Sequence, residues 1–176
     1  MRVVAGELRG RRIGAPKGAA TRPTADRVRE AVFSILGDVS GARVLDLYAG
    51  SGALAIEALS RGAAEADLVD SSPAAIAAIR RNLDQLGIEA GVHRRDALAW
   101  LADAEGGRPY DLVFADPPYD AAVRIGPLLA ERLPAVLQPD AVIVTESNKR
   151  APLELPFALL RERTYGDTRI AVHRHG

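Results

Sequence analysis

The chain has 176 residues, of which 48% are hydrophobic and 26% charged, values that fit one globular domain and argue against general disorder. It contains no cysteine, which excludes disulfides, thiolate metal sites and a cysteine nucleophile. No apolar run approaches the length of a membrane span, and the sequence begins without the apolar segment of a signal peptide. We therefore expect a cytoplasmic protein that contacts no membrane.

Charge is unevenly distributed along a chain whose formal net charge is zero. Residues 1–29 hold eight basic and two acidic side chains, so this segment carries +6 and the rest of the chain −6. A basic arm on an acidic body favours a polyanionic partner contacted from one side, although a solvated arm would show the same composition. The basic residues expected to make this contact are Arg2, Arg9, Arg11, Arg12, Lys17 and Arg22.

The first elements expected are a short β-hairpin over residues 2–15, with Gly6 and Gly10 at its turn, and then a connector rich in Pro and Gly. A helix capped by Thr24 or Asp26 follows. Its apolar stripe consists of Val28, Val32, Phe33 and Leu36.

From residue 43 onward, predicted strands and helices alternate. The strands are expected at residues 42–48, 66–70, 90–95, 110–115 and 141–147. The helices are expected at residues 53–62, 73–87, 97–104 and about 122–132. The final segment, 157–174, is typical of an antiparallel hairpin that turns at Tyr165-Gly166-Asp167. Such alternation predicts an α/β fold with a parallel sheet and helices on both faces.

Four acids mark one edge of this predicted sheet. Asp46, Asp70, Asp96 and Asp116 fall at or just past the carboxyl ends of the first four strands, where α/β sheets bind ligands. Helix capping explains one or two of them, Asp96 most readily, but not all four. The pattern therefore predicts an acidic, hydrogen-bonding ligand site.

A glycine-rich turn, DLYAGSGALA at residues 46–55, follows the first of these strands. Gly50, Gly52 and Ala55 satisfy the G-x-G-x-x-G/A pattern, and Asp70 lies 20 residues beyond Gly50, so the loop also fits a dinucleotide site. A pyrophosphate on this turn would be opposed by the Asp46 carboxylate. S-adenosylmethionine (SAM) has no phosphate and carries an ammonium and a sulfonium, which favours SAM over NAD.

In that interpretation Asp46 attracts the positively charged groups of SAM. Asp70 accepts hydrogen bonds from the ribose hydroxyls, and Asp96 accepts one from the adenine amine.

The stretch FADPPYD at residues 114–120 ends the fourth strand on a stiff corner. Pro117 and Pro118 offer no N–H and fix their own φ, so Asp116 and Tyr119 are held with little freedom to relax. On its own this corner could be only a tight turn.

DLYAGSGALAIEALSRGA together with FADPPY resembles the class I methyltransferases that modify exocyclic amines of nucleobases. RVVAGELRGRRI, RPTADRVREAVFSIL and RTYGDTRIAVHR extend the resemblance, over nearly the whole chain, to the bacterial 16S rRNA guanine-N2 methyltransferase family. The chain departs from that family's pattern at Ser34, Tyr48 and Ala55, where Asn, Phe and Gly are expected. None of these departures touches the four acids.

The resemblance implies a Rossmann-like class I fold with a mostly parallel seven-stranded sheet, a C-terminal antiparallel hairpin and a short N-terminal hairpin extension. It implies a catalytic domain over residues 23–176 and an RNA-contacting arm over residues 1–22. The cofactor-binding residues would be Thr24, Asp46, Tyr48, Gly50, Gly52, Asp70, Ser71, Asp96 and Ala97. The catalytic residues would be Asp116, Pro117, Pro118 and Tyr119.

An aryl amine is a weak nucleophile because its lone pair is delocalised into the base. If Asp116 and the Pro117 carbonyl each accept one of its two N–H bonds, the lone pair is aimed at the sulfonium methyl. Tyr119 would stack on the target base, which must first leave its own stack. The expected partner is 16S rRNA within the 30S subunit or an assembly particle, and the protein is expected to be a monomer.

Other residues receive no functional role. Glu57 and Asp67 are interpreted as solvated or capping side chains, and the three scattered histidines predict no metal site. Two alternative functions remain open. One is a DNA adenine-N6 or cytosine-N4 methyltransferase with the same corner, and the other is a non-catalytic RNA-binding module or a NAD-linked enzyme of similar fold.

Overall fold

A computed structural model describes residues 1–17, 25–118 and 120–176. The described residues form one seven-stranded sheet in the order β3-β2-β1-β4-β5-β7-β6. The strands are β1 (Arg43–Leu47), β2 (Glu65–Asp70), β3 (Gly91–Arg94), β4 (Tyr110–Ala115), β5 (Leu137–Asn148), β6 (Ala158–Tyr165) and β7 (Thr168–Arg174). The first five strands pair in parallel, and β7 is antiparallel to both β5 and β6.

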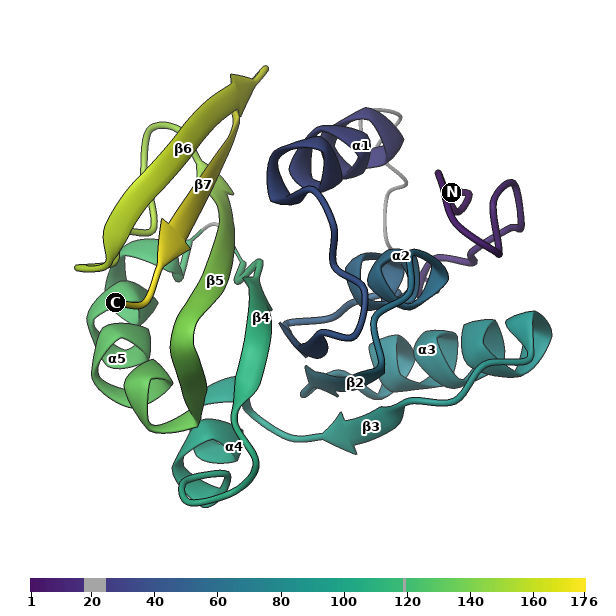
Figure 1. The fold of residues 1–176 in the computed structure, drawn as a ribbon, viewed down its shortest axis with the longest axis horizontal. Coiled ribbons are helices and arrows are strands. Elements are labelled where there is room, and N and C mark those ends of the chain that lie inside the picture. The colour runs from purple at the N-terminus through teal and green to yellow at the C-terminus, as the bar shows by residue number, and fades with distance from the viewer. Residues whose placement is uncertain (18–24, 119) are drawn as a thin grey trace.

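Helices cover both faces of the sheet (Figure 1). They are α1 (Ala25–Leu36), α2 (Ala53–Ser60), α3 (Pro73–Leu86), α4 (Ala97–Asp103) and α5 (Ala122–Arg132), with a 3-10 turn at Leu133–Val136. Alternate strand residues point to opposite faces, so two separate cores form. Val44 and Phe114 pack with α1, α2 and α3, whereas Leu45 and Val113 pack with α4 and α5. None of the helices in the described ranges is long and apolar enough to cross a membrane.

Local sequence signals explain where the helices begin and end. Ser72 caps α3 by accepting a hydrogen bond from the Ala75 N–H, Pro73 occupies the first helical position, and Gly87 ends the helix at φ 69°. Asp96 caps α4 in the same way, through the Ala99 N–H at 3.0 Å.

The predicted mostly parallel α/β sheet with a C-terminal hairpin is confirmed. Two details differ from the prediction. β5 begins at Leu137 rather than at residue 141, across a register shift opposite Tyr110 and Leu112 and a left-handed Asp140 at φ 63°. The N-terminal hairpin turns at Gly6 and Gly10 as expected, but its ladder is reduced to one isolated bridge between Arg2 and Arg12.

The N-terminal arm, residues 1–17, packs closely on the body. Its Val3 and Ile13 are 2% and 3% exposed and belong to the core on the α1–α3 face. Gly6 lies so close to α2 that an added Cβ would stand 1.7 Å from the Ser60 carbonyl oxygen, so only glycine fits there. On the α3 side, Asn82 exchanges two 2.9 Å hydrogen bonds with the Gly14 backbone.

Glu57 of α2 is the centre of this docking. Its side chain is 0% exposed and accepts hydrogen bonds from the backbone N–H groups of Val4 and Ala5 at 2.8 and 2.9 Å. It also pairs with Arg29 of α1 at 3.3 Å and with Arg61 at 2.8 Å. The interpretation of Glu57 as a solvated or capping residue was therefore wrong, because a buried carboxylate here joins the arm, α1 and α2.

Glu57→Ala is expected to destabilise the protein by about 3–5 kcal/mol, because it removes the buried carboxylate that pairs with Arg29 and Arg61 and leaves two partly buried backbone N–H groups without their acceptor. Urea unfolding would measure the loss, and amide hydrogen exchange should show Val4 and Ala5 opening first. The control is Asp103→Ala, which removes an exposed pair with Arg95 and should leave the midpoint close to wild type. A Glu57 variant as stable as this control would contradict the assigned role.

Candidate active site

The turn after β1 is held in a conformation that few residues adopt. Tyr48 has φ 62° although it is not glycine, and Gly50 and Gly52 follow at φ 57° and 78°. A Cβ on Gly52 would lie 2.8 Å from a Leu68 methyl, so this position requires glycine for space as well as for φ. The strained turn brings the start of α2 over the carboxyl end of β1.

Asp46 lies within β1 and is 2% exposed. Its Oδ2 accepts a 3.2 Å hydrogen bond from the Ala55 N–H in the first turn of α2. Burial raises the pKa of Asp46 to about 7; the Ala55 hydrogen bond lowers it, and the nearby charge of Asp70 raises it further. Asp46 is therefore a buried carboxylate that a cationic ligand would stabilise in its charged form.

Asp70, the last residue of β2, braces the glycine turn. Its Oδ2 accepts from the Gly50 N–H at 2.9 Å, and its Oδ1 accepts from the Ser72 N–H at 2.8 Å. An ionised carboxylate has about four lone-pair directions, so Asp70 can still accept from a ligand hydroxyl.

Asp96 and Ala97 do not line the cavity that Asp46, Tyr48, Gly50, Asp70 and Ser71 share. Asp96 is exposed at the start of α4, and Ala97 is buried. Asp96 is nevertheless close to Tyr48: burial, followed by the charge of Asp96, raises the pKa of the Tyr48 hydroxyl to about 12. The adenine role of Asp96 stays a prediction.

The corner after β4 lies directly beyond Ala115. Asp116 is half-buried, Pro117 is buried and Pro118 is exposed. The Pro118 carbonyl accepts from the Ala121 N–H at 2.9 Å, which turns the chain into α5. Tyr119 lies outside the described residues, as do Thr24 and Arg22, so their predicted roles are not tested.

One cavity of about 830 Å³ joins these elements. The predicted residues that line it are Asp46, Tyr48, Gly50, Asp70, Ser71, Asp116, Pro117 and Pro118. Their carboxyl-end positions on β1, β2 and β4, which are adjacent in the sheet, explain why the topology brings them together. Gly52 does not line the cavity, and caps α2 instead.

The cavity also has walls that the sequence reasoning missed. They come from the arm, α1, β5 and β7, and they are Met1, Ala15, Pro16, Val28, Val32, Glu146, Thr168 and Ile170. Glu146 could have been found, because it follows the same rule as the four aspartates: an acid near the carboxyl end of a parallel strand. The other wall residues could not have been found, because apolar residues that line a cavity look the same in the sequence as apolar residues of the core.

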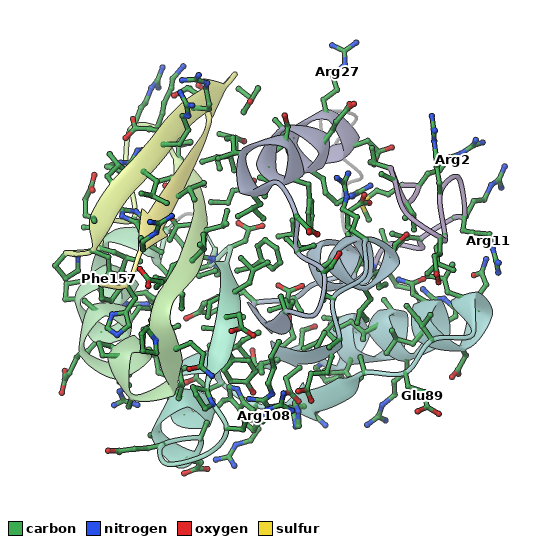
Figure 2. The ribbon with its side chains drawn as sticks, in the orientation of Figure 1. Arg2, Arg11, Arg27, Glu89, Arg108 and Phe157 are labelled. Atoms are coloured by element: carbon green, nitrogen blue, oxygen red, sulfur yellow. The ribbon has the colours of Figure 1, made fainter. Side chains whose placement is uncertain are left out.

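Six basic residues were predicted to contact a polyanionic partner, and five of them lie in the part of the chain that the structure describes. None of these five lines the cavity. Arg2, Arg9, Arg11, Arg12 and Lys17 are exposed on the arm beside it. Figure 2 shows Arg2 and Arg11 extending outward from the arm, and Arg11 also donates to the Gln85 carbonyl of α3 at 2.9 Å.

Asp67, given no role from the sequence, belongs to a second charged group away from the cavity. Its Oδ2 contacts the Tyr110 hydroxyl at 2.8 Å and an Arg43 guanidinium nitrogen at 2.9 Å, and its Oδ1 lies 2.7 Å from His93 Nε2. The His93 ring stacks on Trp100. The interpretation of Asp67 as a solvated or capping side chain was wrong, because this network connects four strands.

The sheet order, the antiparallel C-terminal strands and the cavity over the carboxyl ends of β1, β2 and β4 define the fold of class I SAM-dependent methyltransferases. Within that class, residues 1–174 match the family described as "Conserved hypothetical protein 95", and the chain belongs to this family.

Relatives in this family have informative names. The chain is 38% identical over 183 residues to YlbH of Bacillus subtilis, named as a candidate rRNA methyltransferase, covering 99% of this chain and 98% of the relative. It is 33% identical to ribosomal RNA small subunit methyltransferase D of Haemophilus influenzae, covering 94% and 89% of the two chains.

Solved structures agree on the architecture. A candidate methyltransferase of Escherichia coli, YhhF, superposes with a TM-score of 0.83 at 34% identity, covering 99% of this chain and 97% of that one. A candidate methyltransferase solved in complex with SAH, SMU.776, superposes with a TM-score of 0.72, covering 88% of this chain and 50% of that one. Because the sequence identity to SMU.776 is only 14%, this superposition supports the fold and no more.

Proposed function

We propose that the protein transfers a methyl group from SAM to the exocyclic N2 amine of a guanine in 16S rRNA. The observation that carries the proposal is one cavity in which a buried acid, a second strand-end acid and the Asp-Pro-Pro corner meet. One relative named as a candidate rRNA methyltransferase and another named as a small-subunit rRNA methyltransferase support this substrate class.

The residues of the cavity fit SAM in charge and in hydrogen bonding. Asp46 is a buried carboxylate in need of a cation, which the methionine ammonium supplies. Asp70 has free lone pairs for ribose hydroxyls beside the Gly50 turn. A pyrophosphate would be repelled by both carboxylates, so this chemistry disfavours NAD.

When bound, SAM supplies an electrophilic methyl group on a sulfonium sulfur. Asp116 and the Pro117 carbonyl would accept the two N–H bonds of the target amine and direct its lone pair to that methyl. The methyl group would pass from the sulfur to the amine nitrogen with the S–CH₃ electron pair left on sulfur, and the amine would give up one proton to solvent. No hydrogen bond to the Pro117 carbonyl is found within the described residues, so this oxygen can accept from the N–H of a ligand.

Tyr119 would stack on the flipped base and Thr24 would contact the cofactor. Gly52 would hold the turn as the residue that caps α2, and Ser71 would line the adenosine end of the cavity. Asp96 and Ala97 would lie beside that end, outside the residues that line the cavity. The chain would divide into an RNA-contacting arm over residues 1–22 and a catalytic domain over residues 23–176.

The proposed substrate is a 30S subunit or an assembly particle, met in the cytoplasm by a monomer. A protein of 18.7 kDa with a short arm has little surface for selecting one guanine from naked RNA. The relatives named as rRNA methyltransferases favour rRNA over DNA as the methylated polymer.

The test is transfer of tritium from methyl-labelled SAM to 16S rRNA in particles from an enzyme-deficient source. Label should appear as N2-methylguanine in 30S particles and much less in naked 16S rRNA or DNA. Label on DNA instead of rRNA would refute the substrate, and calorimetry that detects NAD but not SAM would refute the class of enzyme.

The arm's exposed cations would hold the RNA backbone. Replacing Arg2, Arg9, Arg12 and Lys17 together with Gln should lower the slope of log K against log [salt] by about 0.7 per lost phosphate contact. Substitution is preferred to truncation, because removing the arm would expose the core packed on Val3 and Ile13. An unchanged slope would remove the arm from the RNA interface.

A further inference from the structure

A groove of about 510 Å³ lies between α1 and the β6–β7 hairpin, outside the proposed active site. Its polar walls are dominated by Arg161 and Arg163 of β6 and Arg174 of β7, all three exposed. Ser34 and Ile35 of α1 form the opposite wall. Figure 1 shows α1 standing apart from these strands, with the N-terminal arm on its other side.

The basic character of this face follows from strand alternation. Arg161, Arg163 and Tyr165 share one face of β6, and Glu162 points to the other. There Glu162 is bound by Arg169 at 2.7 Å. The hairpin thus places its acid with a partner on the α5 side and leaves the groove side to arginines.

These three arginines have no protein counter-ion in the part of the chain that the structure describes. None of them forms an ion pair there, and Arg163 donates only to its neighbour's carbonyl, at 3.1 Å. Arg169 shows the contrast, since it contacts Glu154, Glu162 and the Leu153 carbonyl. Three like charges gathered in one groove therefore favour an external anion.

The groove and the proposed active site are lined by neighbouring residues of the same strands. Thr168 and Ile170 of β7 line the large cavity, and Arg174 lines the groove at the same side of the same strand. Val144 and Val142 of β5 make the same transition. Thr168 and Arg174 are about 20 Å apart along β7, at about 3.3 Å per residue, a separation that several nucleotides span.

We propose that this arginine groove binds the phosphate backbone of the single-stranded RNA flanking the target guanine, on the side of α1 opposite the N-terminal arm. Arg161 and Arg163 lie about 7 Å apart along β6, a spacing similar to that of neighbouring phosphates in an extended strand. The inference rests on the proposed function, and it adds a second RNA surface that a basic N-terminus alone does not provide.

The test variant is the full chain with Arg161→Gln, Arg163→Gln and Arg174→Gln. Its affinity for a labelled single-stranded RNA is measured by fluorescence anisotropy between about 50 and about 200 mM salt. The slope of log K against log [salt] should fall by about 2, which is about 0.7 for each of three phosphate contacts. With 30S particles the KM should rise, while kcat and SAM affinity stay near wild type.

The charge-matched control carries Arg80→Gln, Arg94→Gln and Arg108→Gln. These arginines are exposed and lie on α3, on β3 and near the start of β4, and Figure 2 shows Arg108 at the opposite end of the molecule from α1. This control should keep the wild-type slope. Equal slopes for both triple variants would overturn the inference.

The three single variants Arg161→Gln, Arg163→Gln and Arg174→Gln are tested in case the triple variant misfolds, and each should lower the slope by about 0.7.

Different results would refute the proposed function and the proposed groove. Wild-type protein that transfers no methyl group to rRNA refutes the proposed function, whereas active wild type with an unchanged slope in the variants refutes only the groove.

Discussion

Asp116→Ala is expected to lower the rate of methyl transfer by at least about 100-fold while leaving SAM affinity within a few-fold of wild type. The reason is that Asp116 lies on the substrate side of the cavity, past the end of β4, whereas Asp46 and Asp70 form the proposed cofactor side. A group that orients the nucleophile and stabilises developing positive charge acts in the transition state, and losing one such contact costs about 10²–10³ in rate. Single-turnover transfer of tritium to 30S particles would measure the rate, and calorimetry the SAM affinity.

The rate of methyl transfer by Asp116→Asn should lie between the rates of Asp116→Ala and wild type, because the amide oxygen still accepts a hydrogen bond but carries no charge. The matched control is Asp84→Asn, an exposed carboxyl on α3 outside the cavity, which should keep full activity. If Asp116→Ala turns over within a few-fold of wild type, the residue does not hold the amine.

The fold could be predicted because its signals are local. Strand-to-helix alternation, the Ser72-Pro73 start of α3 and the Gly87 end lie within a few residues of what they specify. The grouping of Asp46, Asp70 and Asp116 was also predictable, since parallel strands have their carboxyl ends at one edge. The early start of β5 was not predictable, because Pro139 and Asp140 are typical of a turn and not of a strand interior.

The errors concern residues whose role depends on distant partners. Glu57 has the sequence context of an exposed helix residue, yet the arm folds over it and supplies two N–H donors from more than 50 positions away. Asp67 became the centre of a network only because the register puts Arg43 and His93 on neighbouring strands. Burial of a charge by a remote segment is a tertiary effect, and no local pattern encodes it.

Asp46→Asn is expected to weaken SAM binding by about 30-fold or more, from the 2 kcal/mol or more that losing one partner of a buried charge pair costs. The free carboxyl has a pKa raised to about 7 by burial, and it must be ionised to attract the ammonium. Wild-type affinity for SAM should therefore be full above about pH 7 and fall as pH decreases below it, by up to about tenfold per pH unit. Calorimetry across this range would detect the fall, and the Asn variant should lack it.

Adenosine provides the ligand control, because it has no ammonium group and its affinity should not depend on the charge of Asp46.

The raised pKa of Asp46 also determines how this residue changes the stability of the protein with pH. Since the folded value lies above the unfolded one, the contribution of Asp46 to stability is present below about pH 4 and is lost as pH rises through about 7. Asp46→Asn should therefore be at least as stable as wild type at about pH 8, whereas the exposed control Asp38→Asn, whose pKa is lowered by Ser40, should not gain stability there. A variant that loses both SAM binding and stability at this pH would show that Asp46 serves the α2 cap rather than the ligand.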